Sequence, residues 1–476
     1  MFDQELEQFI CDYVKELEAG TAAVFAGAGL SASSGFVNWA QLLEPLARQL
    51  NLDAHKDGEN LVALAQYYVN NEGGSKSDLQ RRLLEEFAVH ADPHENHRII
   101  ARLPIPVYWT TNYDQLIEQS LRERRRNPDV KSSVDQLSFS LPRRDAIVFK
   151  MHGDIGEPSK VVLTRDDYER YSTERAPFVT ALSGDLVSRT FLFLGFSFTD
   201  PNLDYVLSRI RMHFSPGNTR KHFALFRRVQ RSSFSSDEAF IYARTKQTLA
   251  ITDLKRFNIK ALLVDEYVDI TQVLQQIEKR YRRKTIFISG SADEFGRWAR
   301  DDVEEFLHSL GRSLIQKGYR IVSGFGLGIS NALISGAIET LHERRLGRFE
   351  DFLTVRPFPR HFADPDKRTA LWTNFRNDMI GEAGVAMFLF GNKSEGGRTV
   401  DADGVAEEFE IASSLGLDLV PVASTGYMAR ALADTLIARP EPPPYSDDLR
   451  TLAEEHGRPQ ELLEPLLQIL DRIAGR

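Results

Sequence analysis

The sequence predicts an α/β protein with two domains, each built around a Rossmann-like parallel β-sheet. Short, strongly apolar segments alternate with amphipathic helical segments along the whole chain, as in parallel sheets whose strands are joined by helices. The chain has 476 residues, enough for more than one hydrophobic core. A charged stretch at 281–284 interrupts the series, so we expect domains at residues 1–283 and 284–476.

The first half contains five predicted strands, because five short apolar runs are bounded by polar or glycine-rich segments. These runs lie at 22–27, 106–110, 146–153, 191–198 and 260–265. Apolar residues at helical spacing predict helices in the intervals and after the last strand. These helices lie at 61–69, 79–89, 95–103, 115–125, 203–210 and 269–281.

The second half repeats this design. Its predicted strands lie at 285–292, 319–328, 353–358, 384–392 and 417–425. The first two run into turns rich in small residues, which predicts close backbone packing or a ligand at that end of the sheet. The predicted helices lie at 297–317, 405–416 and 461–473.

Bulk composition excludes several classes of protein and site. The formal net charge of −9 argues against a nucleic-acid-binding protein, whose surface is usually basic. Cys11 is the single cysteine, so intramolecular disulfides and a four-cysteine zinc site are excluded, and we expect no metal. The acidic, amphipathic N-terminal segment is unlike a signal peptide, and the longest strongly apolar stretch, 190–198, is too short to cross a membrane. We therefore expect a cytoplasmic protein that binds neither nucleic acid nor membrane.

Four strands of the first half end in polar or glycine-rich turns, at 27–31, 112–114, 152–154 and 195–200. Ligands of open parallel sheets bind outside the carboxyl ends of the strands. We therefore expect these four turns to converge on one site, although they are far apart in the sequence.

The first of these turns also fits a nucleotide-binding motif. Residues 27–32 read G-A-G-L-S-A, which matches the G-x-G-x-x-A fingerprint of dinucleotide-binding folds. The absence of side chains lets the oxygens of a pyrophosphate approach backbone N–H groups. The acidic residue expected about 20 residues later, at the end of a second strand, is not visible, which disfavours an ordinary dehydrogenase. A purely structural turn stays open as the alternative.

Longer motifs resemble known families. GAGLSASSG (27–35), TNYD (111–114) and KMHGD (150–154) follow the order of the sirtuin family, and GFSFTDPNLD (195–204) resembles its bacterial, zinc-free branch. In the second half, FISGSA, SGFGLG, FRNDM and DGVAEEFE resemble the SLOG family, the nucleotide-sensing relatives of the lonely-guy fold. The two halves in this order resemble the effectors of Thoeris antiphage systems over nearly the whole chain.

The sirtuin resemblance implies that the first half binds and cleaves NAD+. Asn112 and His152 are the implied catalytic residues. An amide can hold a ribose hydroxyl and a water, and an imidazole with an ordinary pKa of about 6.5 is largely neutral at pH 7 and can accept a proton. The implied NAD+-binding residues are Gly27, Ala28, Gly29, Ser31, Asp114, Gly195 and Ser197.

Structural roles stay open for several of these residues. Asn112 and Asp114 also suit the N-terminal turn of a following helix, where amide and carboxylate side chains are favoured. Ser31 and Ser197 also suit turn capping. Asp200, which directly precedes a proline, is expected only to cap a helix.

The SLOG resemblance implies a site for a signalling nucleotide in the second half. An arginine can bind phosphate through two parallel hydrogen bonds, a lysine adds a point charge, and a glutamate can accept from ribose hydroxyls. Arg356 is a further candidate, and a solvated surface charge remains the alternative for each charged residue of this site. The implied residues are Gly290, Ser291, Gly324, Gly326, Arg376, Lys393 and Glu408.

Together the resemblances imply an NAD+ hydrolase that releases nicotinamide and ADP-ribose as an abortive-infection effector. They further imply activation by a cyclic ADP-ribose isomer, made by a TIR-domain partner protein, and a homotetrameric assembly. Deacetylating sirtuins carry four zinc cysteines, and catalytic lonely-guy enzymes carry a GGxGT stretch, and both features are missing from this sequence. The alternatives are an NAD-dependent protein deacylase, a non-catalytic NAD- or nucleotide-binding module, and a phosphoribohydrolase in the second half.

Overall fold

The computed structural model describes residues 2–36, 39–54, 61–71, 76–87, 91–213, 219–358 and 365–475. The chain divides into two compact units, Met1–Glu278 and Lys279–Arg476, each with its own parallel sheet. From the sequence we expected this division between residues 283 and 284. Among the described residues, no helix is both long enough and apolar enough to cross a membrane.

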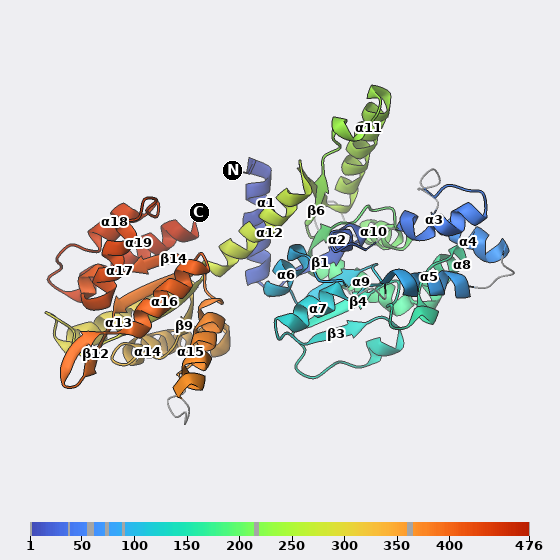
Figure 1. The fold of residues 1–476 in the computed structure, drawn as a ribbon. Helices are drawn as coiled ribbons and strands as arrows, with labels where there is room; N and C mark the ends of the chain where they lie inside the picture. The colour runs from blue at the N-terminus through green and yellow to red at the C-terminus, as the bar shows by residue number, and fades with distance from the viewer. Residues whose placement is uncertain are drawn as a thin grey trace. The chain divides into compact units, whose positions relative to one another are not determined.

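The first unit is built on a seven-stranded parallel sheet (Figure 1). Its strands are β1 Ala22–Ala26, β2 Val107–Thr110, β3 Pro128–Lys131, β4 Ala146–Lys150, β5 Thr190–Leu194, β6 His222–Arg227 and β7 Ile259–Val264. Their order across the sheet is β3-β4-β2-β1-β5-β6-β7. Strands β2 to β4 lie on one side of β1 and strands β5 to β7 on the other, so the topological switch point lies between β1 and β5.

Two strands of this sheet, β3 and β6, were missing from the sequence prediction. β3 begins at Pro128 and carries the charged Asp129 and Lys131, while β6 begins at His222 and ends at Arg227. Buried parallel strands are recognised by a continuous apolar run, and these polar residues break the run in both segments.

Helices connect the strands of the first unit. They are α1 Gln4–Glu18, α2 Ala28–Ala32, α3 Trp39–Gln49, α4 Leu61–Asn71, α5 Ser77–Phe87, α6 Glu95–Arg102, α7 Leu116–Glu123, α8 Arg165–Glu174, α9 Ala176–Ser188, α10 Pro201–His213 and α11 Asp237–Leu254, and α12 Tyr267–Arg282 crosses the division. The helix predicted at 79–89 corresponds to α5, and residues 88 and 89 lie outside the described residues.

Aromatic side chains pack across the centre of this sheet. Phe25 of β1 and Phe193 of β5 stack with ring centroids 5.3 Å apart, and Trp109 of β2 and Phe149 of β4 stack at 4.2 Å. All four rings are buried. Removal of this apolar area from water holds the four central strands together.

The second unit contains a five-stranded parallel sheet of order β10-β9-β8-β11-β14 (Figure 1). Its strands are β8 Thr285–Ser291, β9 Arg320–Ser323, β10 Leu353–Val355, β11 Val385–Phe390 and β14 Asp418–Pro421, and β12 Asn392–Glu395 pairs with β13 Arg398–Asp401 in a separate antiparallel hairpin. The helices are α13 Arg300–Gln316, α14 Ser330–Arg344, α15 Pro365–Ile380, α16 Asp403–Ser414, α17 Tyr427–Ile437, α18 Ser446–Thr451 and α19 Leu463–Ala474. The predicted fold class, two Rossmann-like parallel sheets, is confirmed.

Helices α13 and α14 approach each other through reciprocal glycines. A Cβ atom on Gly311 of α13 would lie under 3.0 Å from the carbonyl oxygen of Leu333, and one on Gly336 of α14 equally close to that of His308. Since both obstacles are backbone atoms, neither can move aside without moving its helix. The crossing therefore requires glycine at both positions.

We expect Gly311→Ala to lower the free energy of unfolding of the second unit by about 2 kcal/mol, because the added methyl group overpacks the crossing. Amide hydrogen exchange of α13 measures this loss. Gly184→Ala is the control: Gly184 lies in α9 with nothing within 4 Å of an added Cβ. It should stabilise its unit by roughly 0.5–1 kcal/mol through its higher helix propensity. Equal exchange rates in α13 of Gly311→Ala and the unmodified protein would contradict the prediction.

Candidate functional site

Four neighbouring strands of the first sheet end in line. Ala26 of β1 pairs with Thr110 of β2 and with Leu194 of β5, and Thr110 pairs with Lys150 of β4. The four polar or glycine-rich turns singled out from the sequence follow at or directly after these residues. The strand register therefore brings the turns side by side at one edge of the sheet, around its switch point.

The turns after β1 and β5 touch through their backbones. The N–H of Gly29 donates to the carbonyl oxygen of Gly195 at 2.9 Å, and Gly27 N–H donates to that of Leu194 at 2.9 Å. A Cβ on Gly195 would lie under 3.0 Å from the backbone nitrogen of Leu30, and Gly195 has φ +62°, a conformation that favours glycine. Packing between the two turns thus explains much of the small-residue composition of the motif.

Asn112 and Asp114 bind the turn after β1. Asn112 Nδ2 donates to Ser31 Oγ at 2.8 Å and to the carbonyl oxygen of Gly27 at 3.0 Å, and Ser31 Oγ donates to Asp114 Oδ2 at 2.7 Å. The other oxygen of Asp114 accepts from the backbone N–H of Leu116 at the start of α7. The side chain of Asn112 is therefore not the cap of α7, whereas Asp114 serves both the helix and the site.

A buried lysine that sequence reasoning missed joins the turns after β2 and β4. Lys150 is fully buried at the end of β4, and its Nζ donates to the carbonyl oxygens of Tyr113 and Asp114 and to the carboxylate of Asp154, and lies 3.2 Å from Glu118 Oε1. Burial acts to lower the pKa of this ammonium, but the nearby carboxylates outweigh burial and raise it. The sequence did contain a signal for this buried lysine, because Lys150 ends the otherwise apolar run AIVFK.

His152 lies two residues further on and contacts Asp200, a contact that sequence reasoning missed. Its Nε2 is 3.3 Å from Asp200 Oδ2, and the hydroxyl of Tyr168 is 3.4 Å from the same oxygen. Burial lowers the pKa of His152, while the charge of Asp200 partly opposes that shift. Asp200 Oδ1 also accepts from two backbone N–H groups, those of Asn202 and Leu203, so it caps α10 as expected and contacts the imidazole in addition.

The remaining candidates of the first unit differ in their contacts. Ala28 and Gly29 are exposed at the turn after β1, beside the buried Gly27. Ser197 is exposed, and its hydroxyl pairs with that of Thr199 at 2.8 Å. Side-chain hydrogen bonds thus join Asn112, Asp114 and Ser31, while Ser197 stands apart from that network.

In the second unit, Arg376 and Glu408 form a buried cluster. Glu408 Oε2 accepts from Ser289 Oγ at 2.6 Å, and its other oxygen lies 3.4 Å from Arg376 Nε. The guanidinium also lies over the ring of Phe358, 5.0 Å from its centroid. Burial raises the pKa of Glu408, and its bonds to Ser289 and Arg376 act in the opposite direction.

The glycine-rich turns of the second unit lie at the carboxyl ends of β8 and β9. A Cβ on Gly326 would lie under 3.0 Å from the carbonyl oxygen of Gly290, and one on Gly324 would lie 2.6 Å from the Phe358 ring. Ser291 Oγ donates to the carbonyl oxygen of Asn392 at 2.9 Å. These turns therefore pack against each other and against the ring that covers Arg376.

Lys393 and Arg356 form surface ion pairs. Lys393 Nζ lies 2.9 Å from Asp403 at the start of α16, and Arg356 lies 2.5 Å from Glu382. Asp403 directly precedes Gly404, where an added Cβ would lie 3.0 Å from Arg376 Nη2. The N-terminus of α16 thus lies between Lys393 and Arg376, whereas no described contact brings Arg356 to this cluster.

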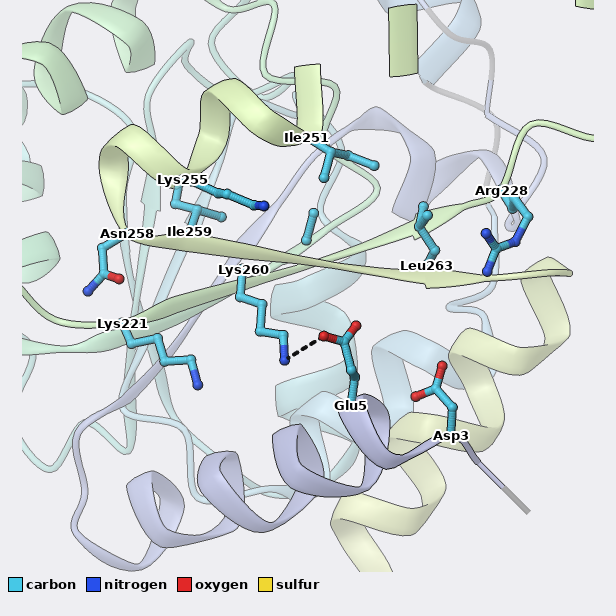
Figure 2. A pocket seen from close by; sticks show the side chains of 11 residues that line it. Asp3, Glu5, Lys221, Arg228, Ile251, Lys255, Asn258, Ile259, Lys260 and Leu263 are labelled. Atoms are coloured by element: carbon cyan, nitrogen blue, oxygen red, sulfur yellow. Dashed lines mark ion pairs between the residues drawn. The ribbon is translucent and has the colours of Figure 1, made fainter. Parts of the chain in front are cut away.

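A cavity of about 530 Å³ lies elsewhere, along the edge strand β7 of the first sheet (Figure 2). Its charged side chains are largely paired: Lys260 with Glu5 at 3.3 Å, as Figure 2 shows, and Lys221 with Asp12 at 3.3 Å. None of the candidate residues lines this cavity. In the described part of the chain, no cluster of histidine, cysteine, aspartate or glutamate side chains is arranged to hold a metal ion.

Comparison with known proteins finds two families and several full-length relatives. Residues 106–248 match the SIR2-like domain, and residues 269–473 match the Sir2- and TIR-associating SLOG family. The chain is 47% identical to the NAD(+) hydrolase ThsA of Acinetobacter baumannii, across 99% of this chain and 100% of the relative. It is 47% identical to the ThsA of Bacillus cereus, across 90% and 88%, and 42% identical to that of Cytobacillus dafuensis, across 99% and 97%.

We expect Asp200→Asn to lower the pKa of His152 further, because a neighbouring carboxylate favours the charged imidazolium. Asparagine is as good a helix cap as aspartate, so α10 should keep its N-terminus. NMR titration of histidine-labelled protein measures the pKa, with His152→Gln used to assign the signal. An unchanged or higher pKa would show that Asp200 does not act on the ring.

Proposed function

Because this chain belongs to the ThsA family of NAD(+) hydrolases, we propose that its first unit cleaves NAD+ at the edge formed by Asn112 and His152. The family predicted from the motifs is thereby confirmed. One observation supports this choice of site. The carboxyl ends of four strands lie side by side around the switch point, and Asn112 is hydrogen-bonded there to the turn after β1. The products are nicotinamide and ADP-ribose.

The chemistry suits the residues at this edge. The bond between nicotinamide and ribose is already activated, since nicotinamide leaves as a neutral molecule with the bonding electron pair. The sugar then passes through an oxocarbenium-like state, as in glycoside hydrolysis, and water adds to it. The protein has no need of a strong acid for the leaving group. It must hold the ribose, place the water and accept a proton.

Asn112 and His152 divide these tasks. Two hydrogen bonds fix the amide nitrogen of Asn112, so the amide oxygen has one direction in which to accept from a ribose hydroxyl or a water. The lowered pKa of His152 keeps its imidazole neutral at pH 7, the form that accepts a proton from a hydroxyl or from the attacking water. Asp200, 3.3 Å from Nε2, stabilises the imidazolium that results. Gly27, Ala28, Gly29, Ser31, Asp114, Gly195 and Ser197 remain the proposed NAD+-binding residues.

The second unit is proposed to regulate this activity by binding a cyclic ADP-ribose isomer. Arg376, Lys393 and Glu408 would contact the nucleotide, with the turns of Gly290, Ser291, Gly324 and Gly326 as its rim. The description of the matched SLOG family as Sir2- and TIR-associating supports a TIR-domain protein as the source of the signal. An antiphage role and a homotetrameric assembly follow from the same family resemblance and are part of the proposal.

Such regulation sets an energetic requirement. To shift the protein from 1% to 99% active, the nucleotide must bind the active state about 10⁴-fold more tightly, which corresponds to about 5.5 kcal/mol. Charge-assisted hydrogen bonds contribute about 1.5–3 kcal/mol each. A few bonds from Arg376 and Lys393 to two phosphates are therefore sufficient, provided that they form in only one state.

We expect Asn112→Ala and His152→Ala each to abolish nicotinamide release, by at least about 100-fold, because positioning and proton transfer each contribute that much or more. Nicotinamide release from NAD+ by the purified chain, with cyclic ADP-ribose isomers present, measures the rate. His342→Ala, an exposed histidine of α14, is the control and should keep full activity. Full activity in either site variant would remove that residue from the mechanism, and release that strictly required an acylated peptide would favour a deacylase.

We expect Arg376→Ala to abolish or strongly weaken activation by the nucleotide, because the buried guanidinium is the main anion-binding group of the second unit. Nicotinamide release is measured against the concentration of each isomer. Arg312→Ala is the matched control, since Arg312 lies on α13 in surface ion pairs with Glu339 and Glu343. An activation curve equal to that of the control would defeat the assignment of Arg376.

A further inference from the structure

We propose that Glu407 is an internal competitor for the anion that Arg376 binds, and that it sets the affinity and the charge selectivity of the nucleotide site. The inference rests on the proposed function, because it takes Arg376 as a nucleotide-binding residue. It adds a residue that acts against binding in the ligand-free protein.

The contacts of Arg376 carry this inference. Its guanidinium is almost buried, and Nη1 donates to Glu407 Oε2 at 2.5 Å. The second oxygen of Glu407 accepts from Thr373 Oγ1 at 2.9 Å, so the carboxylate is held on both sides by side chains of α15. Carboxylate and phosphate oxygens bind the same N–H groups of a guanidinium. A phosphate that takes the N–H of Nη1 bound to Glu407 must therefore displace Glu407.

The two carboxylates around Arg376 differ in whether they can leave. Glu408 is buried, accepts from Ser289 Oγ, and contacts the guanidinium at Nε at 3.4 Å. Glu407 keeps 40% of its side chain exposed and can turn into water, where its charge is fully hydrated. An incoming anion thus exchanges with Glu407 and leaves Glu408 in place.

A similar but weaker arrangement exists at Lys393. Its partner Asp403 is 88% exposed and Lys393 itself is 41% exposed, so this pair is a solvated surface ion pair. Such pairs contribute little to stability and are easily broken. Arg376, unlike Lys393, is almost buried, so its ion pair is less screened by water. Displacement of Glu407 therefore affects anion binding more than displacement of Asp403 does.

The need to displace Glu407 selects for ligands with high negative charge. A ligand that replaces Glu407 must interact with Arg376 better than one carboxylate does, and a diphosphate brings more negative charge and more acceptor oxygens than a carboxylate. A neutral nucleoside gains nothing at the guanidinium and leaves the ion pair intact. Glu407 thereby keeps uncharged and weakly charged metabolites from occupying the site.

Glu407→Gln tests the proposal, since glutamine keeps the shape and an acceptor for Thr373 but removes the charge. With the full chain, the half-maximal concentration of an activating cyclic ADP-ribose isomer should fall roughly fivefold to tenfold, as expected for loss of one competing ion pair. The affinity for inorganic pyrophosphate, measured by calorimetry, should rise by a similar factor. The double variant with Arg376→Ala should lose pyrophosphate binding.

Glu410→Gln is the matched control, because Glu410 lies exposed on the same helix and carries the same charge. The proposal is overturned if Glu407→Gln and Glu410→Gln behave alike, if Glu407→Gln weakens binding, or if pyrophosphate binds neither protein. Failure of the proposed function looks different. In that case no isomer activates the unmodified chain, while the pyrophosphate measurement still decides whether Glu407 competes at Arg376.

Discussion

The candidate active site depends on one constraint, the close backbone approach of the turns after β1 and β5. Gly27, Gly29 and Gly195 lie so close that an added Cβ at any of them would clash with backbone across the gap. This approach fixes the turn after β1 at the switch point of the sheet, and Asn112 is oriented by bonding to that turn. The position of the Asn112 amide therefore depends on a backbone contact between two turns that lie far from Asn112 in the sequence.

A second interaction supports the first. Lys150 gathers two carbonyl oxygens and two carboxylates in a fully buried cluster, which ties the turn that carries Asn112 and Asp114 to the turn that carries His152. A buried charge is costly unless it is paired and hydrogen-bonded, and here it is both. The resulting cluster gives one common anchor to the two turns that carry the proposed catalytic side chains.

The sequence was sufficient to predict the fold class and the turns of the candidate site, because apolar runs ending in glycine or polar residues mark parallel strands and their carboxyl ends. It was insufficient for β3 and β6, whose polar residues hide the strand pattern, and for the roles of Lys150 and Asp200. Asp200 was read as a helix cap, which it is, but its contact with His152 joins residues 48 positions apart (152 to 200). Local patterns do not encode such contacts. Likewise, the sequence alone does not reveal the pairing of Arg376 with Glu407, because that contact depends on how α15 and α16 are placed relative to each other.

The two contacts of the Asp200 carboxylate have a mechanical consequence. One oxygen holds the first turn of α10 and the other faces the imidazole of His152, so a single carboxylate is shared between a helix and the proposed base. If α10 shifts along its axis, the carboxylate travels with it and the electrostatic support of the ring is altered at once. The position of α10 and the pKa of His152 are therefore coupled through one carboxylate, so a small shift of the helix would change the proton affinity of the proposed catalytic imidazole.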